Sequence, residues 1–157
     1  MSKGIVEHAL VVRDGAVASL ARLKSVALLL GRLAVGLVFL STGWGKVHNV
    51  EKVTAFFTSL HIPAPGLNAV VVGWSELLCG VALVIGLVTR LATIPLIVSM
   101  VVAILTAKRG DIHGFFDLIA FEETTYLLVL VMIAILGPGA ISIDHLCAKK
   151  YRRVPEA

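Results

Sequence analysis

Residues 67–107 read LNAVVVGWSELLCGVALVIGLVTRLATIPLIVSMVVAILTA and contain only two charged side chains, Glu76 and Arg90. A soluble chain of 157 residues has too much surface for its volume to bury a run this long and apolar. Arg90 divides the run into two pieces, each near the ~20 residues that cross the hydrocarbon layer of a bilayer. The stretch therefore predicts two antiparallel transmembrane helices, over residues 67–88 and 91–107.

Two more apolar stretches, residues 25–44 and 118–136, have the length of membrane-spanning helices. The whole chain is 58% hydrophobic, with a mean hydropathy of +0.96. Charged residues make up 15% of it, against roughly a quarter in an average soluble domain. We therefore predict an all-α protein, an antiparallel four-helix transmembrane bundle whose outer surface contacts the lipid bilayer.

The segments outside the four spans differ in character. Residues 50–60 carry apolar side chains on one side of a helix, which predicts a short interfacial helix in the first outer loop. Residues 1–24 mix apolar and charged side chains, and both a surface amphipathic helix and a flexible tail fit this pattern. We assign residues 25–145 to the transmembrane domain and residues 146–157 to a basic tail.

The basic residues predict the orientation, because cytoplasmic segments of membrane proteins carry an excess of lysine and arginine. Nine of them lie in the two terminal segments and the turn at Arg90, namely Lys3, Arg13, Arg22, Lys24, Arg90, Lys149, Lys150, Arg152 and Arg153. Four lie in or beside the two longer loops, namely Lys46, Lys52, Lys108 and Arg109. Both termini are therefore predicted to be cytoplasmic. No nucleic-acid partner is expected, because the net charge of +4 is not gathered on a polar surface that carries aromatic residues.

The ionisable residues inside the spans are the candidate site. Arg32, Glu76, Glu122 and Glu123 fall within predicted spans, and Lys46 follows the first span. A charge at the centre of a bilayer costs at least ~2.5 kcal/mol, so these groups are expected to face one another in a buried polar pocket. Arg32 and Lys46 lie on one stripe of their helix, and Glu76 lies on a stripe of the second span.

Depth in the membrane suggests partners for these charges. We predict a buried Arg32–Glu76 pair near the midplane and a second pair between Lys46 and Glu122 or Glu123. Two interpretations remain open: the pairs only fix helix register, or they line a pocket for a headgroup, a quinone or a proton path. The sequence assigns no catalytic residue and no metal site, since its histidines and cysteines lack ligand spacing.

Three patterns, in this order, carry a family resemblance. The first span holds R-x3-G-x2-F-x3-G-x2-K, formed by Arg32, Gly36, Phe39, Gly43 and Lys46. The second holds E-x3-G-x2-L with a following G-x2-T-R, formed by Glu76, Gly80, Leu83, Gly86, Thr89 and Arg90. Glu123 and an ending GPG-x2-S-x-D follow, the latter formed by Gly137, Pro138, Gly139, Ser142 and Asp144. Over roughly residues 26–145 the chain resembles the DoxX family of small four-helix membrane proteins.

The resemblance implies a multi-pass protein of the bacterial inner membrane. It implies an accessory subunit of a quinone-linked redox system, connected with sulfur or thiosulfate metabolism or with oxidative stress. Quinone would then be the cofactor and a membrane or peripheral redox protein the partner, and a homo-oligomer is compatible with the same role. The protein would be part of an oxidoreductase, although no self-contained active site is visible. The alternative is a non-catalytic membrane partner or assembly factor whose buried charges are structural.

Overall fold

The protein folds into helices throughout the part of the chain that can be described. The computed structural model describes the backbone of residues 2–151 and the side chains of residues 23–150. The elements in this range are α1 (Ser2–His48), α2 (Val50–Ser59), α3 (Pro65–Ile85), α4 (Thr89–Thr106), η1 (Arg109–Asp111), α5 (Phe115–Ala120), α6 (Glu122–Leu136) and α7 (Ile143–Tyr151). The prediction of an all-α protein is therefore confirmed.

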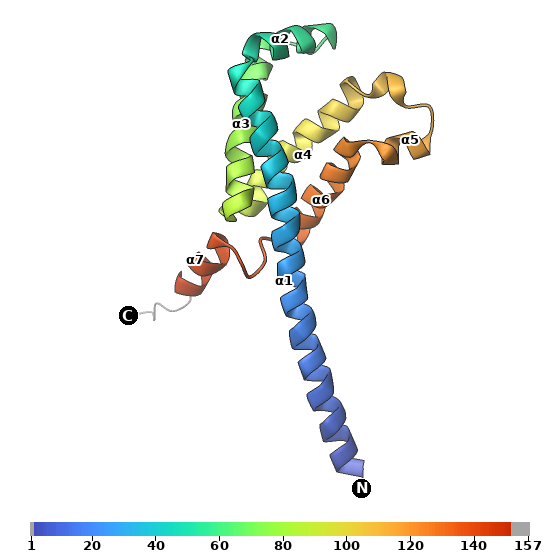
Figure 1. The fold of residues 1–157 in the computed structure, drawn as a ribbon, viewed down its shortest axis with the longest axis vertical. Coiled ribbons are helices and arrows are strands. Elements are labelled where there is room, and N and C mark those ends of the chain that lie inside the picture. The colour runs from blue at the N-terminus through green and yellow to red at the C-terminus, as the bar shows by residue number, and fades with distance from the viewer. Residues whose placement is uncertain (1, 152–157) are drawn as a thin grey trace.

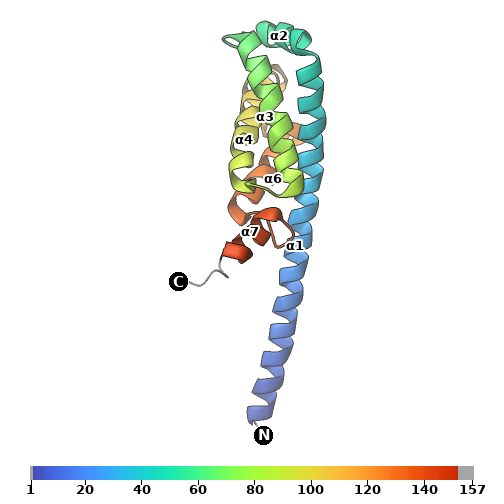
Figure 2. The ribbon, with the colours of Figure 1, turned by 90° about the vertical axis from the view of Figure 1, so that its left-hand side faces the viewer.

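Four helices are arranged in a ring (Figures 1 and 2). Helix α1 contacts α3, α3 contacts α4, α4 contacts α6, and α6 contacts α1. Three of these helices contain segments that are long and apolar enough to cross a membrane, over Leu23–His48, Pro65–Ile85 and Thr89–Thr106. These segments agree with the first three predicted spans.

The fourth predicted span, residues 118–136, is divided at Phe121, whose backbone is extended between α5 and α6. Helix α6 has 15 residues and a length of about 22 Å, short of the ~30 Å thickness of the hydrocarbon. Its first turn carries Glu122 and Glu123, which are favourable at a helix N-terminus and costly inside hydrocarbon. The predicted four-helix transmembrane bundle is thus confirmed only in part, as three candidate spans within the described residues and a shorter fourth helix.

Helix α1 extends well beyond the ring. Its 47 residues make a helix of about 70 Å, and Figure 1 shows the N-terminal part projecting away from the other helices. The predicted amphipathic pattern of residues 1–24 falls almost entirely outside the described side chains, and residues 152–157 of the basic tail lie outside the described residues. The transmembrane part of α1 is the part that packs against α3.

The segment between α1 and α3 contains the short helix predicted for residues 50–60. Helix α2 covers Val50–Ser59 and lies across the end of the α1–α3 pair in Figures 1 and 2. Pro65 then occupies the first turn of α3, where a missing backbone N–H costs nothing. Because α2 turns away from the α1 axis, it covers one end of the space between α3 and α4.

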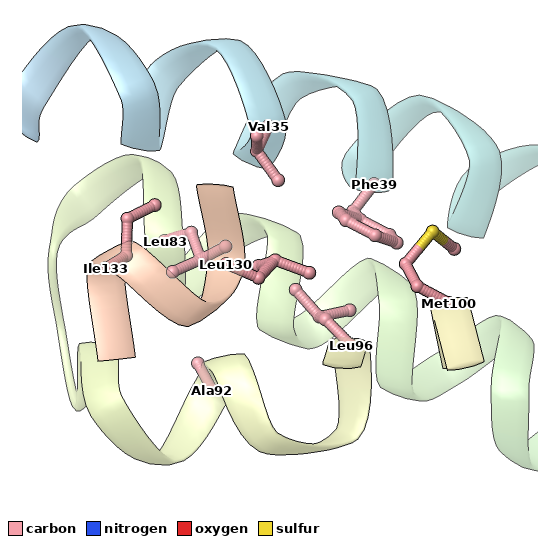
Figure 3. Close-up of a cluster of buried hydrophobic side chains, with 8 residues drawn as sticks. All are labelled: Val35, Phe39, Leu83, Ala92, Leu96, Met100, Leu130 and Ile133. Carbon is pink, nitrogen blue, oxygen red and sulfur yellow. The ribbon is translucent and has the colours of Figure 1, made fainter. Parts of the chain in front are cut away.

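The core is a small cluster of apolar side chains at the centre of the ring (Figure 3). It is formed by Val35, Phe39, Leu83, Ala92, Leu96, Met100, Leu130 and Ile133. Many other large apolar side chains are exposed, including Leu30, Leu78 and Leu105, each more than 60% accessible. Exposed apolar residues on every long helix fit a surface that faces lipid.

Candidate functional site

A buried ion pair joins α1 to α3. Glu76 of α3 is fully buried, and the ammonium Nζ of Lys46 lies 2.6 Å from both of its carboxylate oxygens. The Lys46 side chain is 28% exposed, so the lysine forms the accessible side of the pair. Glu76 is therefore paired with a cation, which a buried carboxylate requires in order to stay charged.

Two hydroxyl groups complete the surroundings of the Glu76 carboxylate. Ser99 of α4 donates from Oγ to Oε1 at 2.7 Å, and Thr42 of α1 lies with Oγ1 3.2 Å from Oε2. Donors from α1 and α4 thus meet on one carboxylate of α3. A charged group held by this many donors fixes the relative positions of the three helices.

Glycines bring α1 and α3 close enough to form this pair. A Cβ at Gly43 would overlap the backbone nitrogen of Leu77, and a Cβ at Gly80 would come within 2.7 Å of the backbone nitrogen of Leu40. A Cβ at Gly73 would lie 3.3 Å from the Cβ of Lys46. Small residues allow membrane helices to approach closely, and here they set the register that places Lys46 beside Glu76.

A cavity of about 950 Å³ lies next to the ion pair, beneath α2 and between α3 and α4. Its walls are mainly apolar, with Phe57 and Leu60 from α2 and its C-cap and Val72 from α3. Lys46 and Ser99 also line the cavity, whereas Glu76 lies behind them and is not part of the lining. The pair therefore presents its donor side, and not its carboxylate, to the cavity.

Arg32 forms a second polar centre at the C-terminal end of α3. Its guanidinium donates to the backbone carbonyls of Leu83 and Ile141, each at 3.0 Å, and to that of Pro138. Arg32 is 1% exposed. Since Leu83 is in the last turn of α3, Arg32 satisfies a carbonyl that the helix leaves without an internal partner and holds the segment after α6 against it.

Asp144, near the start of α7, binds the turn between α3 and α4. Its carboxylate accepts hydrogen bonds from the backbone N–H groups of Val88 at 2.6 Å and Thr89 at 2.9 Å. Burial alone would raise the pKa of Asp144, but these hydrogen bonds and the Arg32 charge outweigh it and hold the pKa below its usual range. Asp144 thus caps the N-terminus of α4, as a carboxylate does favourably.

The predicted pairing of the buried charges is wrong. Arg32 lies level with Leu83, seven residues or about 10 Å along α3 from Glu76, so it binds carbonyls and leaves Glu76 to Lys46. Lys46 accordingly does not pair with Glu122 or Glu123.

The two remaining acids lie elsewhere. Glu123 lies 3.7 Å from Lys108, and Glu122 is exposed. Of the five residues predicted for one pocket, the structure brings together Lys46 and Glu76 and keeps the others apart.

Several residues of these two centres were not predicted as partners. Ser99 is an isolated hydroxyl in an apolar span, and a search for hydrogen-bond donors at the depth of Glu76 could have found it. Thr42 lies one turn before Lys46 on the same helix. Asp144 belonged to the ending pattern, but its contact with the α3–α4 turn depends on how the chain returns after α6.

The fold and the two buried polar centres define a small, helical, multi-pass membrane protein. The chain belongs to the DoxX family, which its residues 27–109 match. It is 34% identical over 130 residues to the uncharacterized membrane protein Rv3486 of Mycobacterium tuberculosis, covering 76% of this chain and 80% of the relative.

Two further relatives come from other bacteria. The chain is 29% identical to inner membrane protein YphA of Escherichia coli, covering 78% of this chain and 91% of that one. It is 30% identical to CatD of Bacillus subtilis, whose name carries a provisional assignment as an oxidoreductase, covering 76% and 85%. No solved structure matches the chain.

Proposed function

We propose that this protein is an accessory subunit of a quinone-linked redox system and that the cavity beneath α2 is the seat of the quinone. One observation carries the proposal: Lys46, held in a buried ion pair, lines a largely apolar cavity of about 950 Å³. This volume falls within the ~300–1,000 Å³ of ligand pockets. The apolar walls suit the isoprenoid tail of a quinone, and the polar corner formed by Lys46 and Ser99 suits its ring carbonyls.

Lys46 is suited to hold the quinone head. Its ammonium has three N–H groups, and at most two of them point to the Glu76 oxygens. The third is available for a quinone carbonyl, which can only accept a hydrogen bond. Ser99 lies at the same corner and donates its one hydrogen to Glu76, so it offers acceptor lone pairs only.

Electrons would come from a partner protein. The two cysteines are free and stand on separate helices, Cys79 in α3 and Cys147 in α7. They therefore offer no dithiol pair for electron transfer. The provisional oxidoreductase name of the relative CatD supports a connection with redox chemistry. We also propose that both termini are cytoplasmic, so that the cavity and α2 lie toward the outer face of the inner membrane.

A second function, that of a non-catalytic membrane partner or assembly factor, is favoured by Arg32. Within the described part of the chain its hydrogen bonds all go to backbone carbonyls, and Arg32 is not among the residues that line the cavity. The Glu76 carboxylate is likewise occupied by donors of its own chain. Under this alternative both centres only hold the helices in place.

Quinone binding to purified protein in nanodiscs separates the two functions. We expect added ubiquinone or menaquinone to raise the melting temperature and to co-purify with the protein, detectable by native mass spectrometry. Ala103→Trp fills the cavity and should abolish both effects. Ala34→Trp adds the same side chain at an exposed position of α1 outside the cavity lining and should leave both unchanged. Equal quinone binding by the Ala103 variant, or no binding at all, would refute the quinone seat.

A further inference from the structure

The hydrogen bonds that join the described residues of α7 to the bundle lie at the beginning of the helix. The Asp144 carboxylate is bound to the start of α4, and the Asp144 backbone N–H donates to the carbonyl of Gly86 at 2.9 Å. Among the described residues, no side chain of α7 after Asp144 makes a hydrogen bond or an ion pair with the bundle. Figures 1 and 2 show the helix leaving the ring at the end opposite α2.

The attachment point fixes the depth of α7 relative to the membrane. Asp144 lies at the turn where α3 ends and α4 begins, both being candidate spans. Helix α3 has 21 residues and a length of about 31 Å, close to the thickness of the hydrocarbon. Its end, and therefore the start of α7, lies at the boundary between the hydrocarbon and the lipid headgroups.

The exposed side chains of α7 suit this boundary. Ile143 is 39% exposed and Leu146 is 65% exposed, and helical spacing places them on one side together with Cys147. Ile141, just before the helix, is 51% exposed. Lys149 and Lys150 follow in the last turn and are exposed too. Apolar residues at the hydrocarbon edge with lysines beyond them form a pattern typical of helices that lie on a membrane.

We propose that α7 docks on anionic phospholipid headgroups of the leaflet it adjoins. Ile141, Ile143 and Leu146 insert at the hydrocarbon edge, while Lys149 and Lys150 bind lipid phosphates. The lysines make α7 bind an anionic surface more strongly than a zwitterionic one, since the negative surface potential of anionic lipids attracts each basic residue close to it. The site is separate from the cavity beneath α2 and does not depend on the proposed redox function.

Cys147 allows a direct test, because it is exposed while Cys79 is partly buried in the core. The full-length Cys79→Ala protein would be labelled at Cys147 with an environment-sensitive fluorophore and reconstituted in two kinds of vesicle. With about 30% phosphatidylglycerol in phosphatidylcholine, we expect a blue-shifted emission and quenching by bromine-labelled acyl chains. With phosphatidylcholine alone, we expect a more water-exposed label.

A variant without the two lysines measures how much their charges contribute to docking. Lys149→Gln/Lys150→Gln should lower the ratio of docked to free α7 by about 30-fold, which corresponds to ~2 kcal/mol at ~1 kcal/mol for each lysine. Lys52→Gln/Arg109→Gln removes two charges in the outer loops and should have no effect. Slower acetylation of Lys149 and Lys150 in anionic vesicles would check the result without a label. The proposal would be overturned if the emission were the same in vesicles with and without phosphatidylglycerol, or if replacing the two lysines left it unchanged.

Discussion

The ion pair between Lys46 and Glu76 should show strong coupling in a double-mutant cycle. Removing one partner of a buried pair costs about 3–5 kcal/mol, because the other charge stays buried without a counter-charge. Lys46→Met leaves the fully buried Glu76 with two hydroxyl donors, so we expect the upper part of that range. Glu76→Gln leaves Lys46, which is 28% exposed, so we expect the lower part.

The double variant Lys46→Met/Glu76→Gln carries no buried charge and keeps a hydrogen-bonded amide beside Ser99 and Thr42. We expect it to be less stable than the wild type by about 1–2 kcal/mol only, since a buried pair and its neutral replacement are similar in stability. The coupling free energy would then be several kcal/mol. It would be measured from reversible unfolding in mixed micelles as the fraction of sodium dodecyl sulfate increases.

The pair Lys108–Glu123 supplies a matched control in the same protein. Its side chains are 35% and 24% exposed and stand 3.7 Å apart. Exposed pairs contribute about 0–1 kcal/mol, so the same cycle there should show weak coupling. If the costs of Lys46→Met and Glu76→Gln simply add in the double variant, the description of Glu76 as a carboxylate that depends on Lys46 is incorrect.

Three other changes test the packing of α1 against α3 and the contacts of Asp144 and Arg32. Gly43→Val should destabilise the protein by at least about 3 kcal/mol and weaken the α1–α3 contact, measured in the same unfolding assay, because the new Cβ would overlap Leu77. Asp144→Asn should cost about 1 kcal/mol at pH 7, because the amide keeps one acceptor oxygen for the N–H groups of Val88 and Thr89 and loses the other together with the charge. Because the pKa of Asp144 is lowered on folding, its contribution should be complete above about pH 4 and disappear below that in the wild type, while the Asn variant shows no such loss. Arg32→Lys keeps the charge but cannot reach three carbonyls, so its melting temperature should fall while quinone binding is unchanged.

The sequence was sufficient to predict that the two charged residues within the first and second spans, Arg32 and Glu76, are buried. Spacing by threes and fours placed Arg32 and Glu76 on inward faces, and both are buried in the structure. Three predicted spans and the short helix α2 also agree with the observed elements. These features follow from local periodicity and apolar length, which a sequence contains directly.

The register of the helices could not be predicted in the same way. A stripe of residues defines the rotation of a helix about its axis but leaves its sliding along the neighbour undetermined. The position of α1 along α3 is set by the contact of Gly43 with Leu77 and of Gly80 with Leu40, which places Lys46, and not Arg32, beside Glu76. The division of the fourth span at Phe121 is a further feature that local periodicity does not contain, because it depends on the position of Glu122 and Glu123 relative to the membrane surface.

The two polar centres differ in whether they leave a hydrogen-bonding group available to a ligand, and this difference indicates where a ligand would bind. At the centre formed by Arg32 and Asp144, the guanidinium is bound by carbonyls and the carboxylate by backbone N–H groups, and neither residue lines the cavity beneath α2. At the centre formed by Lys46 and Glu76, the carboxylate is occupied, but Lys46 lines a cavity with one N–H group not directed at Glu76. The double variant Lys46→Met/Glu76→Gln, which we expect to fold, therefore distinguishes the two functions. If the cavity binds quinone through Lys46, the variant should lose quinone binding. If the ion pair is purely structural, the replacement should not change the binding of any ligand.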